Sequence, residues 1–185
     1  MTNVHQSTGI VQTRHSLLQQ ALNQWLAMHH GALTHAATFT FNERRVWRFI
    51  EASAQFVTPH DEGMIALLRK TMRLFQRRLE RSLYGNAAKR YGQRLLFIPM
   101  LEGLRCGEFP HYHAALGVDE ARAASLLSNI KRAWTSLPFA GHHIELVPYR
   151  DQGWLSYSTK AAYRVNQHSI DWESVSVPLR SPIPC

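Results

Sequence analysis

The chain has 185 residues, 45% of them hydrophobic, which is long enough and apolar enough for a single globular domain (1–185) with its own core. No run of about 18 apolar residues occurs, and the polar N-terminus lacks the apolar stretch of a signal peptide, so no membrane partner is expected. The two cysteines, Cys106 and Cys185, exclude a disulfide framework and a thiolate metal site, so a reducing cytoplasm is the expected location.

The charge balance favours a polyanionic partner. Lysines and arginines number 21 against 13 acidic residues, a formal net charge of +8. Such a surface raises the local concentration of polyanions, of which nucleic acid is the commonest. Charge alone does not establish this partner, because many basic proteins bind no nucleic acid.

The first third of the chain contains helical and extended patterns. Apolar residues at helical spacing predict a helix, and alternation of apolar side chains with threonine predicts a half-buried strand. The expected elements are, in chain order, a helix at His15–Met28 within an N-terminal extension (1–31), a strand around Ala37–Phe41, and a helix capped by Asn42 that ends near Pro59.

Asp61–Leu83 has the clearest helical periodicity of the chain, with apolar residues at alternating spacings of three and four. Beside this apolar face, Arg69, Arg73, Arg77 and Arg81 recur at every fourth residue. This arginine stripe fits either the solvated flank of a core-facing helix or a row of side chains that contact DNA phosphates.

The second half of the chain alternates strands with helices. The expected elements are strands at Arg94–Glu102 and His111–Val118 joined by a short turn around Cys106-Gly107, a helix at Glu120–Trp134, a strand at Ile144–Pro148, a helix at Gln152–Arg164, a last strand at Ser174–Val177, and a frayed tail (178–185). Because strands and helices are mixed and at least one pair of strands forms a hairpin, the sequence predicts an α+β fold with a mainly antiparallel sheet.

His111 and His113 lie two residues apart on a predicted strand. Side chains alternate faces along a strand, so both imidazoles project to the same side and could chelate one cation. If Cys106-Gly107 is a two-residue turn, Glu102 lies directly across from His111 and faces the same way. The sequence therefore predicts a metal site of two imidazoles and one carboxylate, with coordination positions left for substrate oxygens.

Other interpretations of the histidines remain open at this stage. Eleven histidines make chance pairs common, and both residues could be ordinary core or surface side chains. By ligand type, the set could suit iron, zinc or manganese, so a non-haem iron oxygenase is a competing function.

Tyr157 and Lys160 lie three apart on the predicted helix at 152–164 and therefore share a face. A tyrosine oxygen is a poor nucleophile at its usual pKa of about 10, and a nearby cation favours the ionised form. The pair is common in ordinary amphipathic helices, so alone it indicates little.

In order and spacing, these patterns resemble the motifs of the HUH endonucleases, in particular the Rep proteins that initiate rolling-circle replication of plasmids and viruses. The first motif corresponds to ATFTFN (37–42), the second to PHYH (110–113) with Glu102 on the preceding strand, and the third to YSTK (157–160). The resemblance spans about 33–177. It departs from the family in the amphipathic Tyr112 between the histidines and in a basic helix longer than that of the compact viral members, and no helicase domain is expected after the third motif.

The resemblance implies a central, mainly antiparallel five-stranded sheet flanked by helices. It implies that Glu102, His111 and His113 hold Mg²⁺ or Mn²⁺ while Tyr157 attacks the scissile phosphate, leaving a 5′-phosphotyrosine linkage and a free 3′-OH. Lys160 would offset the charge of phosphate or phenolate.

The implied partner is single-stranded DNA at a replication origin, with a hairpin as one form of it, and such an initiator would borrow a host helicase. The predicted DNA contacts are Thr38 and Thr40 of the first motif and the arginine stripe, Arg69, Arg73, Arg77 and Arg81.

Two alternatives stand beside this interpretation. A single-tyrosine transposase of the same family joins DNA ends by the same chemistry. A non-catalytic single-stranded nucleic-acid-binding protein would instead stack bases on Phe39, Phe41 and Tyr112 of an open sheet, with incidental histidines.

Overall fold

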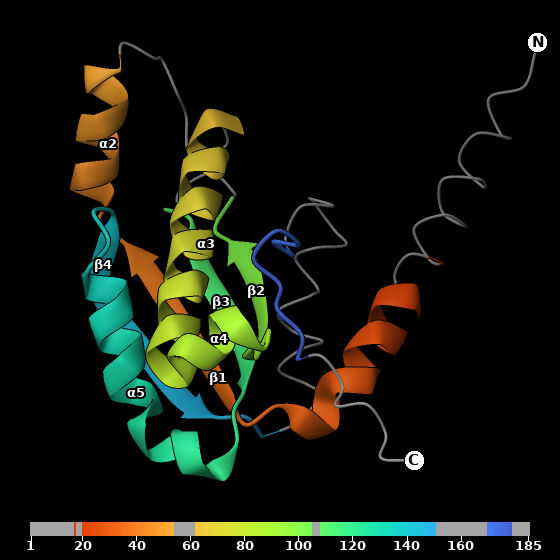
Figure 1. The fold of residues 1–185 in the computed structure, drawn as a ribbon. Helices are drawn as coiled ribbons and strands as arrows, with labels where there is room; N and C mark the ends of the chain where they lie inside the picture. The colour runs from red at the N-terminus through yellow and green to blue at the C-terminus, as the bar shows by residue number, and fades with distance from the viewer. Residues whose placement is uncertain (1–16, 18–19, 54–61, 105–107, 151–169, 179–185) are drawn as a thin grey trace, which may run out of the picture.

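The computed structural model describes residues 17, 20–53, 62–104, 108–150 and 170–178 (Figure 1). These residues form an α+β fold in which helices flank a four-stranded antiparallel sheet. In this part of the chain, no helix is long and apolar enough to cross a membrane.

The sheet has the strand order β2-β3-β1-β4, so β1 lies in the interior although it comes first in the chain. All of the neighbouring pairs are antiparallel. The strands are β1 (His35–Phe41), β2 (Leu96–Glu102), β3 (His111–Gly117) and β4 (Ala140–Pro148).

The long helix α3 and the helix α5 cover one face of the sheet, and α2 extends beyond the sheet from the end of β1 (Figure 1). The helical elements are η1 (His30–Ala32), α2 (Glu43–Ala52), α3 (Glu62–Tyr84), α4 (Asn86–Arg90) and α5 (Glu120–Thr135), and residues 20–29 are also helical.

The main core lies between this covered face and the two helices. Phe39 of β1 packs against Phe75 of α3 and Trp134 of α5, with ring centroids 4.8 and 5.1 Å apart. Phe75 and Trp134 also meet each other edge to face at 5.3 Å. These aromatic contacts tie the helices to the centre of the sheet.

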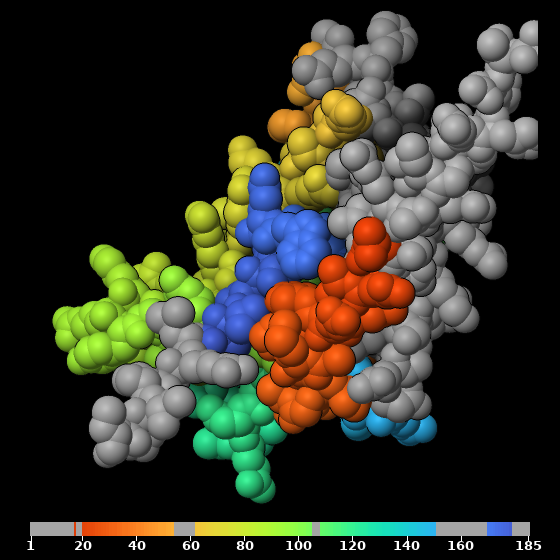
Figure 2. Space-filling view, turned by 90° about the vertical axis from the view of Figure 1, so that its right-hand side faces the viewer, coloured from red at the N-terminus to blue at the C-terminus, as the bar shows by residue number. Residues whose placement is uncertain are grey.

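A smaller apolar cluster lies on the opposite face. Ile98 and Met100 of β2 and Ala115 of β3 pack there against Leu26 of the helix at 20–29 and against Ile170. The N-terminal helix and the segment 170–178 lie side by side over this cluster (Figure 2).

Two helices begin at the caps that their sequences provide. Asn42 accepts a hydrogen bond from the Arg45 backbone amide at 3.0 Å, as predicted for α2. Asp119 does the same for the Arg122 amide at the start of α5, also at 3.0 Å.

Among the described residues, the sheet has four strands and not the five that the sequence predicted. The segment predicted as a last strand (174–177) makes one isolated bridge to β2, at Phe97–Ser176, and a second bridge, Met100–Ile170, lies before that segment. Residues 172–174 form a turn between these bridges, so a continuous ladder does not form.

Smaller differences concern the limits of elements. β4 begins at Ala140, four residues before the predicted start, and the short helix α4 lies between the elements predicted at Asp61–Leu83 and Arg94–Glu102. α2 ends at Ala52, with Ser53 as its C-cap, and not near Pro59 as predicted. The predicted turn at Cys106-Gly107, the helix at 152–164, and the tail beyond 178 lie outside the described residues.

Candidate metal centre

The two histidines lie on the same side of β3, as strand alternation predicts. Tyr112 between them points into the main core and is fully buried, whereas His111 and His113 are half-buried on the opposite face. Their rings lie 5.1 Å apart and nearly perpendicular. The middle position is therefore a packing position, and the flanking positions are available for chemistry.

Glu102, the last residue of β2, is paired with His111 in the antiparallel register. This confirms the register that the sequence predicted. Glu102 Oε2 lies 3.5 Å from Nε2 of His113, and one ligand atom from each of the three side chains lies within 4.8 Å of the others. Among the described residues, this is the one group of His, Cys, Asp or Glu side chains close enough to hold a metal ion.

The orientation of the histidine rings is supported by neighbours on the other side of each ring. Nδ1 of His113 lies 3.1 Å from the Thr38 hydroxyl, and Nδ1 of His111 lies 3.4 Å from the Phe109 carbonyl oxygen. A proton on Nδ1 of His113, donated to Thr38, leaves the Nε2 lone pair facing Glu102. Such a partner orients a metal-binding imidazole.

Burial dominates the electrostatics of this cluster. It raises the pKa of Glu102 to about 7, and the nearby Glu108 carboxylate adds to the effect. Burial also lowers the pKa of His113 to about 4, helped by the adjacent His111. The pocket therefore disfavours both the carboxylate of Glu102 and the imidazolium of His113 unless a cation compensates the carboxylate.

The residues fit a divalent cation. Glu102 Oε1 is buried and has no hydrogen-bond partner among the described residues, and an oxygen in that state costs free energy unless something binds it. Several divalent metals accept two imidazoles and a carboxylate as ligands, so the cluster could bind an ion. The ligand types do not show which metal it is.

Thr38 and Thr40, predicted as DNA contacts, lie on β1 opposite His113 and His111 respectively. Thr38 bonds the ring of His113, and the Thr40 hydroxyl donates to the carbonyl oxygen of His143 at 3.2 Å. The sequence patterns did not indicate the Thr38–His113 bond, because only the pairing of β1 with β3 brings these residues together.

The arginine stripe lies on α3, against the opposite face of the sheet from the candidate metal centre, and its members differ in environment. Arg73 forms an ion pair with Glu173 at 2.6 Å, and Arg69 is half-buried. Arg77 and Arg81 are exposed. Only the second half of the stripe is thus fully open to a ligand.

Three aromatic residues that could have stacked bases are buried instead. Phe39 and Tyr112 are 0% exposed and Phe41 is 6% exposed, because α3 and α5 cover that face. Base stacking on these rings, as suggested from the sequence, is therefore wrong.

Tyr112 also has a polar contact that the sequence did not indicate. Its hydroxyl donates to Oδ2 of Asp171 at 2.9 Å, and the Ser174 hydroxyl donates to the same oxygen at 2.8 Å. This buried network attaches the segment 170–178 to the strand that carries both histidines. Tyr157 and Lys160 lie outside the described residues.

Fold and site together define an α+β protein with a candidate divalent-metal centre at one end of an antiparallel sheet. Comparison with protein families, with curated proteins and with solved structures found no match to this chain.

Proposed function

We propose that this chain is a metal-dependent endonuclease of the HUH type, which nicks and rejoins single-stranded DNA to initiate rolling-circle replication. The observation that carries the proposal is the convergence of Glu102, His111 and His113 within 4.8 Å on one face of the sheet. The order of the three sequence motifs supports it, and so does the net charge of +8.

Glu102, His111 and His113 would hold Mg²⁺ or Mn²⁺. A bound divalent ion would polarise the scissile phosphate and offset the charge that develops on it. The chain's own contribution is to aim both imidazoles at the same point, with Thr38 fixing one ring. Held ligands of this kind need no reorganisation when the phosphate arrives.

Tyr157 is proposed as the nucleophile. Its phenol oxygen would form a bond to phosphorus while the bond from phosphorus to the 3′-oxygen breaks. The phenol loses its proton and the departing 3′-oxygen gains one. One phosphoester replaces another, so a later 3′-OH can reverse the step, and Lys160 would offset charge beside the phosphate.

The same set of ligands also fits a second candidate function, that of an oxygenase. Two histidines and one carboxylate on a face with open positions are typical of non-haem Fe(II) oxygenases. A covalent protein–DNA adduct separates the two functions, because an oxygenase forms none.

The test uses a pool of single-stranded oligonucleotides of random sequence, incubated with the protein and Mn²⁺ and analysed on a denaturing gel. We expect a protein–DNA adduct from the wild type and none from Tyr157→Phe, which keeps the ring and removes only the nucleophilic oxygen. Tyr149→Phe and Tyr163→Phe are the matched controls and should form the adduct.

Peptide mapping of the adduct identifies the attacking residue. DNA attached to a peptide with Tyr149 or Tyr163 would contradict the role of Tyr157. Absence of any adduct from a folded, Mn²⁺-bound wild type would contradict the proposed nuclease.

A further inference from the structure

A cleft of about 830 Å³ opens at the end of the sheet opposite the candidate metal centre. It lies where β2 begins, whereas Glu102 stands where β2 ends. The seven residues of that strand place the two sites about 20 Å apart at about 3.4 Å per residue. The side chains that matter here are Tyr84, Tyr91, Gln93, Arg94 and Arg122.

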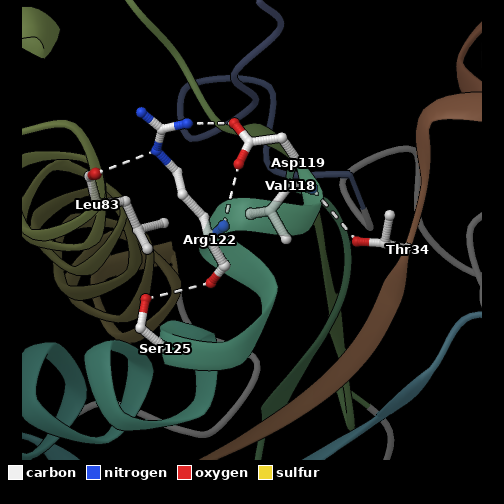
Figure 3. A network of polar contacts seen from close by, with 6 residues as sticks. All are labelled: Thr34, Leu83, Val118, Asp119, Arg122 and Ser125. Carbon is white, nitrogen blue, oxygen red and sulfur yellow. Dashed lines mark hydrogen bonds and ion pairs between the residues drawn. The ribbon is translucent and has the colours of Figure 1, made fainter.

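One wall of the cleft is held in place by a polar network (Figure 3). Arg122 donates from Nε to the Leu83 carbonyl oxygen at 3.2 Å and forms an ion pair with Asp119. The same guanidinium lies over the Tyr84 ring, 4.5 Å from its centroid. The wall is therefore formed before any ligand binds, which lowers the entropic cost of binding.

The rim of the cleft combines an exposed ring with positive charge. Tyr91 is 75% exposed, more than any other large apolar or aromatic side chain described. Lys89 and Arg90 are exposed on α4 beside it, and the yellow-green residues of this region project from the surface in Figure 2. From 81 to 101 the chain has four basic residues and no acidic one.

Arg94 completes the rim. Its side chain is partly exposed and donates to the Ala88 carbonyl oxygen at 3.1 Å. It also lies 3.6 Å from Glu80, which is buried and bonded to Ser176. Arg94 therefore faces the buried Glu80 carboxylate on one side and solvent on the other.

The chemistry of this rim matches a nucleotide. An exposed aromatic ring offers a stacking surface to an unpaired base, and neighbouring cations attract its phosphate. An acidic peptide would use the charges but not the flat ring, and a duplex keeps its bases stacked internally. Single-stranded nucleic acid uses both features.

We propose that this cleft binds an unpaired nucleotide of single-stranded DNA, with the base stacked on Tyr91 and the phosphate beside Arg94. Lys89 and Arg90, exposed on the adjacent helix α4, would attract the phosphates that follow. The inference rests on the proposed function for the identity of the partner. It adds a second DNA contact about 20 Å from the metal centre, so that one single strand of DNA is bound at both ends of the sheet.

The experiment measures the affinity of the full-length protein for a fluorescent single-stranded 30-mer pool in EDTA, so that no metal contributes. Tyr91→Ala should weaken binding about 5- to 150-fold, the range found for removal of one stacked base. Tyr91→Phe keeps the ring and should bind like the wild type. Since Tyr91 is exposed, neither variant should lower the melting temperature.

A second arm locates the DNA directly. Oligonucleotides carrying 5-iodouracil are crosslinked to the wild type by light, and the crosslink is expected in the peptide that contains Tyr91. Equal affinity of Tyr91→Ala and wild type, or crosslinks only elsewhere, would overturn the inference. Preference of the cleft for poly-glutamate over DNA would overturn it as well.

The two proposals fail in different ways. If an adduct forms in Mn²⁺ but DNA affinity does not depend on Tyr91, the proposed nuclease activity stands and only the proposed role of the cleft is contradicted. Tyr91-dependent binding without any adduct would support the cleft and contradict the nuclease.

Discussion

Glu102 is a largely buried carboxyl group beside two histidines, with its side chain 15% exposed and Oε1 without a hydrogen-bond partner among the described residues. Burial raises its pKa from 4.5 to about 7. Because the folded pKa lies above the unfolded one, the ionised group destabilises the metal-free fold. This cost is absent below about pH 4.5, grows as the pH rises, and is complete above pH 7.

Glu102→Gln should therefore stabilise the metal-free protein at pH 8, by up to about 3 kcal/mol from the size of the pKa change. At pH 5 the difference should be much smaller, because Glu102 is then mostly protonated in the folded state. Urea unfolding in EDTA at both values measures it. An identical free-energy difference at pH 5 and pH 8 would contradict the raised pKa.

Thr38 is the residue whose hydroxyl supports the His113 ring. Thr38→Ala should weaken Mn²⁺ binding about tenfold or more, the usual effect of removing a group that orients a metal ligand. Thr38→Ser keeps the hydroxyl and should restore most of the affinity. Calorimetric titration compares the three proteins, and equal affinities would show that this bond does not orient the ring.

At the level of elements, the arginine stripe on helix α3 shows what residue spacing predicts and what it does not. The four-residue interval correctly predicts that the arginines share one side of the helix. Their surroundings differ along the helix, because the segment 170–178 brings an acidic residue to Arg73 while Arg77 and Arg81 remain exposed. Arg73 thus meets Glu173, a residue 100 positions away.

Replacing both Arg77 and Arg81 with alanine should flatten the dependence of single-stranded DNA affinity on salt, by about 0.7 in logarithmic slope for each phosphate that the variant no longer neutralises. Both residues are exposed, so stability should change little. Arg73→Ala is the comparison variant, since its charge is already paired with Glu173. Fluorescence anisotropy across a salt series measures the slopes, and an unchanged slope in the double variant would identify these arginines as an ordinary solvated surface.

At the scale of the whole molecule, one face of the sheet forms the main core and the other carries the candidate metal ligands. Helices α3 and α5 cover one face and build the main core, which holds Tyr112. The other face is covered partly by the helix at 20–29 and the segment 170–178, and the candidate metal ligands lie on that face at one end of β2 and β3.

Metal binding should stabilise the folded chain as a whole, because the unfolded chain does not hold the three ligands together. Mn²⁺ at about 100 times its dissociation constant contributes about 2.7 kcal/mol, or roughly 5–10 °C in melting temperature for a chain of this size. Differential scanning calorimetry should find this rise in the wild type and not in the double variant His111→Ala, His113→Ala. An equal rise in both would place the metal elsewhere.

The sequence by itself determined the parts of the protein that depend on local periodicity. A period of two sends His111 and His113 to one face and Tyr112 to the other, and a short connection pairs Glu102 with His111. The cap at Asn42 and the length of α3 depend on contacts within a few residues of the chain, and both were predicted correctly.

Only the tertiary structure decided which face of the sheet is covered, because alternation separates two faces without saying what packs on either. It placed β1 between β3 and β4, which set Thr38 beside His113, and it buried Phe39 and Phe41 under helices. It reduced the strand expected at 174–177 to a single bridge on β2, at Phe97–Ser176. These features arise from contacts between distant parts of the chain. The packing of the whole core decides which segments meet, and the residue pattern of neither segment indicates its partner.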